Sequence, residues 1–75
     1  MINNKYDFLK YLIAYMSKDT YHFVDKDNNL LNLVDAYKQQ EYLEDLEHDG
    51  FIQTYIGYIQ INPEGILFMK KLYNI

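Results

Sequence analysis

The sequence predicts an α+β fold in one domain, residues 1–75, with helices at both ends and a β-hairpin in the second half. Three observations predict it. Apolar residues recur at helical spacing near the start, the run FIQTYIGYIQI at 51–61 has strand composition around a glycine, and INPEG at 61–65 has the residues of a helix start. Because a chain of 75 residues is too short to divide its core in two, we expect a single domain.

The first predicted helix runs from Asn4 to Ser17, with Asn3 or Asn4 as its cap. Its apolar residues fall on one broad face, and polar residues share the other, as is typical of a helix packed against a core. The apolar face consists of Phe8, Leu9, Leu12, Ile13, Tyr15 and Met16.

A minimal strand is predicted next at TYHFV, from Thr20 to Val24, because this run is β-branched and aromatic and too short for a helix. The polar DKDNN after it, residues 25–29, predicts a turn. Asp27 or Asn28 can then cap a two-turn helix. The apolar residues of that short helix are Leu30, Leu31 and Val34.

A third helix is predicted from a cap at Asp35 to about Asp49, with Gly50 as its left-handed end. The hairpin after it folds about Ile56 and Gly57. A type I′ turn would need a positive φ at the β-branched Ile56. We therefore expect a type II turn with Gly57 at the third position, or a slightly longer loop.

The final helix begins within INPEG. Asn62 caps it, Pro63 occupies the first helical position, where its missing N–H does no harm, and Glu64 lies at the positive end of the helix dipole. Gly65 is a poor helix former, so we expect it to mark close packing against the hairpin.

The order helix, short strand, helix, helix, hairpin, helix resembles the winged-helix domain. YLEDLEHDGFI at 42–52, followed by INPEG at 61–65, is similar to the small MarR- and PadR-like bacterial regulators. In those proteins a leucine-spaced helix ends in Leu-Glu-x-x-Gly-hydrophobic, and the wing returns into a Thr-Pro-x-Gly-like helix start. The resemblance spans residues 30–72 and implies a three-helix core with a short β-strand, a C-terminal two-stranded hairpin as the wing, and a final helix.

In that family the third helix enters the DNA major groove and the wing touches the backbone or minor groove, so the resemblance implies that these two elements carry the recognition residues. Helical geometry turns Gln39, Leu43 and Leu46 of the third helix towards the core and leaves one outward face. The candidate binding residues on that face are Tyr37, Lys38, Glu41, Glu44, Asp45 and His48. Those in the wing are Gln53, Tyr55, Ile56 and Tyr58.

The charges of these residues favour a protein partner over DNA. The outward helix face carries three carboxylates and one lysine, and Glu47 and Asp49 add repulsion at the negative end of the helix dipole. The wing has no charge, the chain has no arginine for guanine contacts, and the net charge is −4. An acidic helix beside an uncharged aromatic hairpin is suited to a basic protein partner, although an acidic face can also serve only for solubility.

We therefore interpret the chain as a non-enzymatic winged-helix module that acts by protein–protein interaction, an inhibitor or adaptor of phage or plasmid type. The alternative is a dimeric DNA-binding transcriptional regulator with the third helix in the major groove, which predicts lysines clustered beside that helix. Self-association through the wing or the first helix, as a homodimer, is a third interpretation.

No residue pattern indicates catalysis, a cofactor or a metal site. The chain has no cysteine and no glycine-rich phosphate loop, and Ser17, its only serine, has no base in sequence reach. His48 with Glu44 one turn earlier is interpreted as an ordinary surface histidine, because no second histidine is near. Without a signal segment or an apolar run long enough to span a bilayer, we expect a cytoplasmic protein that does not bind membranes.

Overall fold

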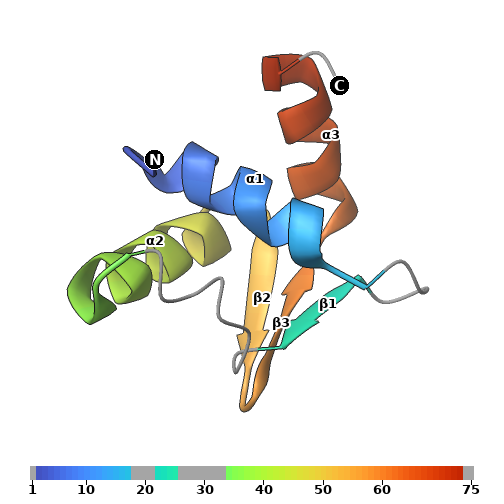
Figure 1. Ribbon diagram of the computed structural model, residues 1–75. Helices are drawn as coiled ribbons and strands as arrows, with labels where there is room; N and C mark the ends of the chain where they lie inside the picture. The colour runs from blue at the N-terminus through green and yellow to red at the C-terminus, as the bar shows by residue number, and fades with distance from the viewer. Residues whose placement is uncertain (1, 18–21, 26–33, 74–75) are drawn as a thin grey trace.

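The computed structural model describes residues 2–17, 22–25 and 34–73 of the chain. Helices and strands in this part follow one another in the order α1, β1, α2, β2, β3, α3 (Figure 1). The predicted α+β class is confirmed. The helices are α1 (Lys5–Tyr15), α2 (Ala36–His48) and α3 (Pro63–Tyr73), and the strands are β1 (Phe23–Asp25), β2 (Ile52–Tyr55) and β3 (Tyr58–Ile61).

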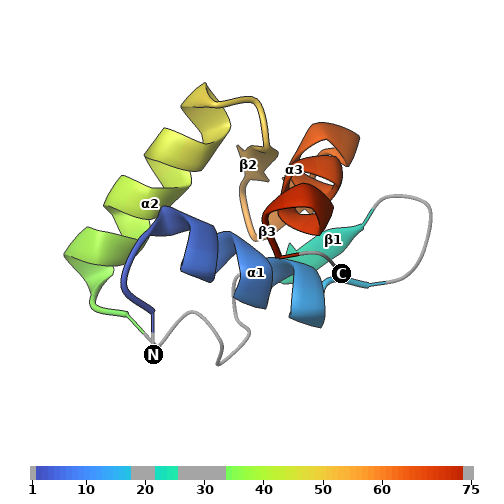
Figure 2. The same cartoon turned by 90° about the horizontal axis from the view of Figure 1, so that it is seen from above.

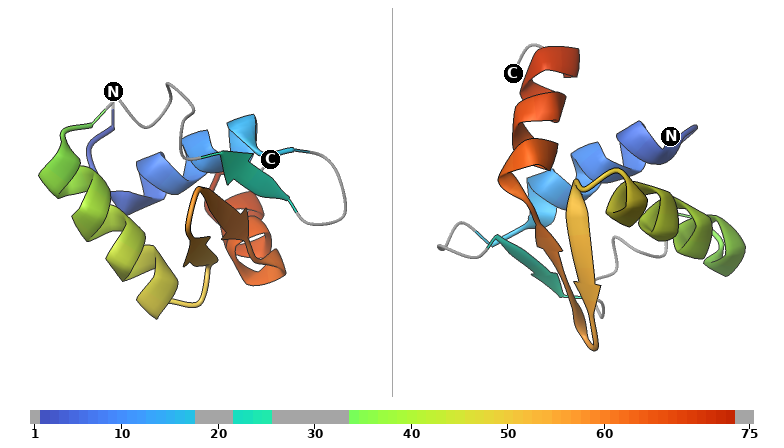
Figure 3. Two further views of the ribbon diagram at one scale, coloured as in Figure 1. Left: turned by 90° about the horizontal axis from the view of Figure 1, so that it is seen from below. Right: turned by 180° about the vertical axis from the view of Figure 1, so that it is seen from behind.

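The strands form one antiparallel sheet in the order β1-β3-β2, so β3 is central and β1 and β2 are the edges. Ile59 of β3 pairs with Val24 on one side and with Thr54 on the other. Seen from above, α1 crosses between α2 and α3 (Figure 2), and α2 lies on the β2 side of the sheet (Figure 3). The tip of the hairpin and the C-terminal end of α3 lie at opposite ends of the molecule (Figure 1).

The core lies between the sheet and the helices, and each of the described elements contributes to it. The core accounts for the spacing of apolar residues in the sequence. Helix residues three and four positions apart point into it, and so do alternate residues of the strands. Tyr15, predicted on the apolar face of the first helix, is 56% exposed. The buried apolar residues are Phe8, Leu9, Leu12, Val24, Tyr42, Leu43, Leu46, Ile52, Ile59, Ile61 and Met69.

α1 begins at a reciprocal cap. The Asn4 side-chain oxygen accepts from the N–H groups of Tyr6 and Asp7, both at 2.9 Å, and the Asp7 carboxylate accepts in turn from the Asn3 N–H at 3.0 Å. This arrangement is a variant of a capping box, in which the third helical residue accepts from the N–H of the residue before the cap, and it satisfies amide donors that have no partner inside the helix. Of the two predicted caps, Asn4 is therefore the one used.

The prediction that the first helix extends to Ser17 was wrong, because a contact with β1 ends it at Tyr15. Met16 is extended, with φ −66° and ψ 150°. The Ser17 N–H donates to the Phe23 carbonyl at 2.8 Å, and the Ser17 hydroxyl accepts from the Phe23 N–H at 3.3 Å. Ser17 thus bonds to the edge of the sheet and cannot continue the helix.

The predicted strand Thr20–Val24 was placed too early: β1 covers Phe23–Asp25, and residues 18–21 lie outside the described part. His22 has a left-handed backbone (φ 53°), so the extended conformation begins only after it. Asp25, predicted to open the turn, instead pairs with Tyr58 of β3.

The predicted two-turn helix at 27–34 lies outside the described residues, except for Val34, which packs against the core. The helix predicted after it is confirmed as α2. The Asp35 side chain accepts from the Lys38 N–H at 2.8 Å and so caps the helix as expected.

The other end of α2 is a Schellman motif. The Gly50 N–H donates to the Glu47 carbonyl and the Phe51 N–H to the Leu46 carbonyl, both at 3.0 Å. Gly50 has a φ of 81°, the left-handed conformation that this motif requires and that glycine adopts without a steric cost. The predicted left-handed stop is confirmed.

The hairpin turns over two residues, Ile56 and Gly57, between the paired Tyr55 and Tyr58. Gly57 has a φ of 88°, and His22 is the only non-glycine residue with a positive φ in the described part of the chain. A type I′ turn is therefore excluded, since it would require a positive φ at Ile56. The backbone angles agree with the expected type II turn.

α3 begins at Pro63, as predicted, and packs closely on the base of the hairpin. The Asn62 carbonyl accepts from the Gly65 N–H at 3.0 Å, and the Asn62 side-chain amide donates to the Gly50 carbonyl at 3.0 Å. A Cβ atom added at Gly65 would lie 2.6 Å from the Phe51 carbonyl oxygen. The predicted close packing at Gly65 is confirmed.

A hydrogen bond joins the beginning of α1 to the end of α3. The Tyr73 hydroxyl donates to the Asp7 carboxylate at 2.9 Å, and the Lys10 ammonium lies 4.6 Å from the centre of the Tyr73 ring. The bond from the Asn3 N–H, followed by that from Tyr73, holds the pKa of Asp7 below its ordinary value. The same bond to Asp7, with burial, raises the pKa of Tyr73.

Replacing Asp7 by asparagine should make the fold less sensitive to acid. Because the pKa of Asp7 is lower in the folded than in the unfolded chain, its carboxylate stabilises the fold above about pH 4, and that contribution is lost as the pH falls through the lowered pKa. In urea unfolding followed by circular dichroism, the free energy of unfolding should therefore fall less steeply below about pH 4 in Asp7→Asn. Tyr73→Phe, which keeps the Asn3 bond, should give an intermediate slope. Equal slopes in all three proteins would contradict the role of Asp7.

Candidate functional site

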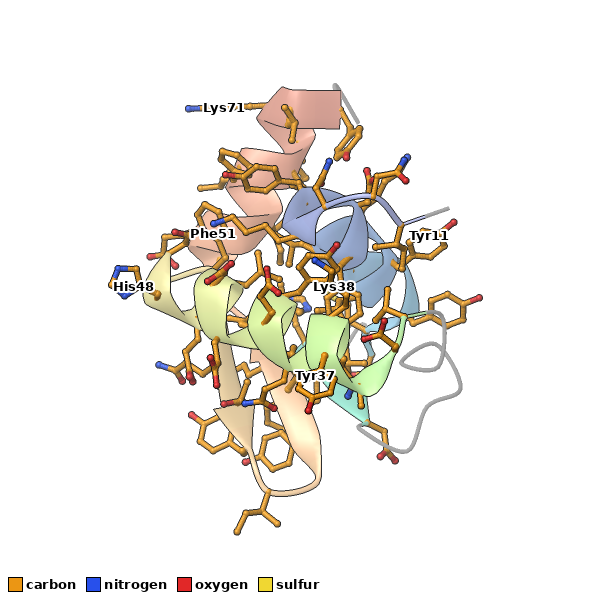
Figure 4. All side chains as sticks on the ribbon, turned by 90° about the vertical axis from the view of Figure 1, so that its left-hand side faces the viewer. Tyr11, Tyr37, Lys38, His48, Phe51 and Lys71 are labelled. Atoms are coloured by element: carbon orange, nitrogen blue, oxygen red, sulfur yellow. The ribbon has the colours of Figure 1, made fainter. Side chains whose placement is uncertain are left out.

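The outer face of α2 is solvent-exposed at every position that the sequence predicted to point outward. Leu43 and Leu46 are buried and Gln39 is half-buried, so helical geometry orients the helix as expected. Tyr37 is 90% exposed. In Figure 4 Tyr37 lies on the side of α2 next to the hairpin, and His48 lies at the C-terminal end. The α2 face consists of Tyr37, Lys38, Glu41, Glu44, Asp45 and His48.

The contacts within the α2 face leave most of its negative charge in solvent. The Lys38 ammonium is 3.7 Å from the Glu41 carboxylate, with both side chains more than half exposed. Gln40 donates to the Glu44 carboxylate at 2.8 Å without adding charge. Because exposed ion pairs at this spacing contribute only about 0.3–0.5 kcal/mol, Lys38 does little to mask the three carboxylates.

Tyr42 is a buried residue of α2 that we did not predict. It is 8% exposed, and its ring centre lies 5.7 Å from that of Phe8. The signal was present, because Gln39, Tyr42, Leu43 and Leu46 follow the spacing i, i+3, i+4, i+7 of one helix face. Tyr42 thus belongs to the core and not to the exposed α2 face.

The hairpin surface, defined as Gln53, Tyr55, Ile56 and Tyr58, is an uncharged aromatic row that ends in an exposed tip. Ile56 at the turn is 100% exposed and Tyr55 is 41% exposed. Tyr58 was predicted to be exposed but is half-buried, because its ring centre lies 4.8 Å from that of Tyr55 and 4.5 Å from that of Phe23. The Tyr55 hydroxyl donates to the Gln53 side chain at 2.6 Å.

Glu47 and Asp49 bind donors from other elements, which the sequence analysis missed. The Glu47 carboxylate accepts from both the N–H and the hydroxyl of Thr54, each at 3.0 Å. The Asp49 carboxylate binds the Lys5 ammonium at 2.7 Å, and this hydrogen bond raises the pKa of Lys5. The repulsion expected at the end of α2 is therefore offset by tertiary contacts, which link α2 to β2 and to α1.

Two of the described lysines, Lys5 and Lys38, lie at α2, and each pairs with a carboxylate. Lys5 is bound to Asp49, and Lys10 lies over Tyr73. Lys70 and Lys71 are in the last turn of α3, and Figure 4 shows Lys71 far from α2. Lys38, on the α2 face itself, pairs with Glu41.

A shallow hollow of about 310 Å³ lies on the outer side of α1. Asp7, Lys10, Tyr11 and Ala14 line it. Asp7 and Lys10 both contact Tyr73, so the two charges of the hollow already have partners. The hollow is separate from the α2 face and the hairpin surface.

Within the three described ranges, no group of three or more His, Cys, Asp or Glu side chains could hold a metal ion. His48 is exposed at the end of α2. No helix in the same part of the chain is both long enough and apolar enough to cross a membrane.

Comparison with known proteins gives no match: no family model fits the sequence, and no curated protein or solved structure resembles it significantly. The functional interpretation therefore depends on the surfaces described above.

Proposed function

We propose that this chain is a winged-helix module that binds a basic protein, without catalysis, through the α2 face and the hairpin surface. The observation that carries the proposal is the juxtaposition of three exposed carboxylates on α2 with a hairpin that has no charged residue. Tyr37 of the α2 face lies on the side of α2 next to the hairpin (Figure 4). In the proposed role α2 supplies charge and the hairpin supplies aromatic contact area.

The topology supports the winged-helix part of the proposal. α2 ends in a Schellman motif and is followed by the hairpin of β2 and β3, which leads directly into α3. The earlier strand β1 pairs with β3 and completes an antiparallel sheet in the order β1-β3-β2. α2 then corresponds to the third helix of a winged helix, and β2 and β3 to the wing. The proposed second helix, at residues 27–34, lies outside the described part of the chain.

The charge distribution supports a basic partner. Like charges close together on α2 raise the local negative potential, and a hairpin without cations leaves that potential unopposed on its side. A partner rich in lysine or arginine would be attracted at long range and would pair with the carboxylates on contact, more weakly at high salt. The phosphate groups of DNA would be repelled by the same carboxylates.

Neutralising the three carboxylates of the α2 face should weaken binding of the basic partner by roughly threefold to about a hundredfold, since each exposed ion pair contributes about 0.2–1 kcal/mol. The test variant is Glu41→Gln, Glu44→Gln and Asp45→Asn, which adds three to the net charge. The matched control is Glu64→Lys combined with Leu67→Lys, both at exposed positions of α3. These changes raise the net charge by two and by one, so the total change in net charge is the same as in the test variant. Binding is measured by affinity capture from the native host and titration with the captured protein.

The proposal expects wild type and the α3 control to capture the same positively charged protein, and the neutralised variant to lose it. Equal capture by all three proteins would contradict a role for the α2 face. Retention of the wild type on duplex DNA that falls steeply with salt, with no protein captured, would support the DNA-binding alternative instead.

A further inference from the structure

β2 is an edge strand whose sequence is prone to pair with another strand. Residues 51–61 contain no charge and no proline, and most of them favour extended structure. Edge strands of this kind offer unpaired N–H and C=O groups, and natural proteins protect them with charges, prolines or covering elements. The hairpin also projects beyond the helices, so its outer half is not covered by them (Figure 1).

Glu47 supplies to this edge the charge that the strand lacks. The Thr54 N–H points away from β3 and donates to the Glu47 carboxylate at 3.0 Å, and the Thr54 hydroxyl donates to the same oxygen. At the opposite edge of the sheet, Ser17 bonds to Phe23 of β1 through its N–H and its hydroxyl. Each edge of the sheet is therefore bonded to a residue from a neighbouring helix or its end.

We propose that Glu47 closes the β2 edge, meaning that it prevents β2 from pairing antiparallel with β2 of a second copy of this chain. Pairing centred on Thr54 would place Thr54 opposite its own counterpart and Gln53 opposite Tyr55. These pairs are uncharged, and facing threonines are favourable across strands, so the segment is complementary to itself. The closure does not depend on the partner proposed above.

The closure acts in two ways. The Glu47 carboxylate accepts the hydrogen bond of the Thr54 N–H, which a second strand would need as a donor. Pairing must therefore first break this bond in both copies. Pairing would also bring two Glu47 carboxylates close to the same two-fold axis, where their charges repel. Removing the carboxylate removes both obstacles.

Glu47→Ala should self-associate about tenfold or more tightly than the wild type, since a symmetric pair gains two strand hydrogen bonds centred on Thr54. Sedimentation equilibrium at several protein concentrations measures the association. Hydrogen exchange locates it, because protection of the Thr54 amide should then increase with protein concentration. Adding Gln53→Lys, a charge on the paired edge, should reverse the association.

Two matched variants separate this bond from a general loss of charge. Glu44→Ala removes a carboxylate one turn earlier on α2 and should sediment like the wild type. Glu47→Gln keeps an oxygen that can accept from Thr54 but loses the charge, so it should associate more weakly than Glu47→Ala. If Glu47→Ala does not fold, Glu47→Asp replaces it, since the charge remains but the side chain is one methylene shorter. The proposal fails if the folded Ala or Asp variant sediments like the wild type, or if Glu44→Ala associates equally.

Discussion

Replacing Ile59 by alanine should lower the free energy of unfolding by about 2–5 kcal/mol. Ile59 is fully buried in the central strand, paired with Val24 and Thr54, so the sheet cannot close over the space that its side chain leaves. A domain of this size has roughly 4–11 kcal/mol of stability in total. Urea unfolding followed by circular dichroism should therefore show a large fall in midpoint, with part of the variant unfolded in buffer.

Gln60→Ala is the matched control for Ile59→Ala, because it changes the next residue of the same strand on the opposite face of the sheet. It should alter the free energy of unfolding by much less than Ile59→Ala. Similar losses in the two variants would mean that strand propensity, and not core packing, limits the stability of the sheet.

Replacing Gly65 by alanine should destabilise the fold by up to about 2 kcal/mol once the gain in helix propensity is subtracted, although alanine is the better helix former. The added methyl would lie 2.6 Å from the Phe51 carbonyl oxygen, which is backbone and already accepts from the Asn62 N–H at 2.9 Å. Forcing α3 away from this point costs about 1–3 kcal/mol as overpacking, and the gain in helix propensity returns up to about 1 kcal/mol.

The measurement for Gly65→Ala is again urea unfolding, and Leu67→Ala on the same helix is the control, since Leu67 is 58% exposed and its truncation creates no clash. The stacked rings of Phe51 and Phe68, 4.7 Å apart, give a second signal in near-ultraviolet circular dichroism that should weaken only in Gly65→Ala. An increase in stability on Gly65→Ala would show that Phe51 can move aside.

The elements that could be predicted from the sequence are those whose signals are local. α2 is capped by Asp35, carries leucines at helical spacing and ends at Gly50, and all three signals agree with the structure. The end of α1 and the position of β1 could not be predicted, because they depend on the bonds between Ser17 and Phe23. No pattern within either segment shows that these two residues meet.

In the candidate site, too, some features could be predicted from the sequence and others could not. The exposure of the α2 face follows from helical periodicity, and the exposed hairpin tip follows from the turn at Gly57. The partners of Glu47 and Asp49 could not be predicted, since they lie seven and 44 residues away in the sequence.

The base of the hairpin has a mechanical consequence for the whole molecule. Phe51 and Asn62, at the two ends of the hairpin, are bonded to each other, Asn62 also holds Gly50, and Gly65 rests on Phe51. The base of the hairpin thus contacts both the C-terminal end of α2 and the first turn of α3. Displacing the base of the hairpin would therefore require breaking contacts to both helices.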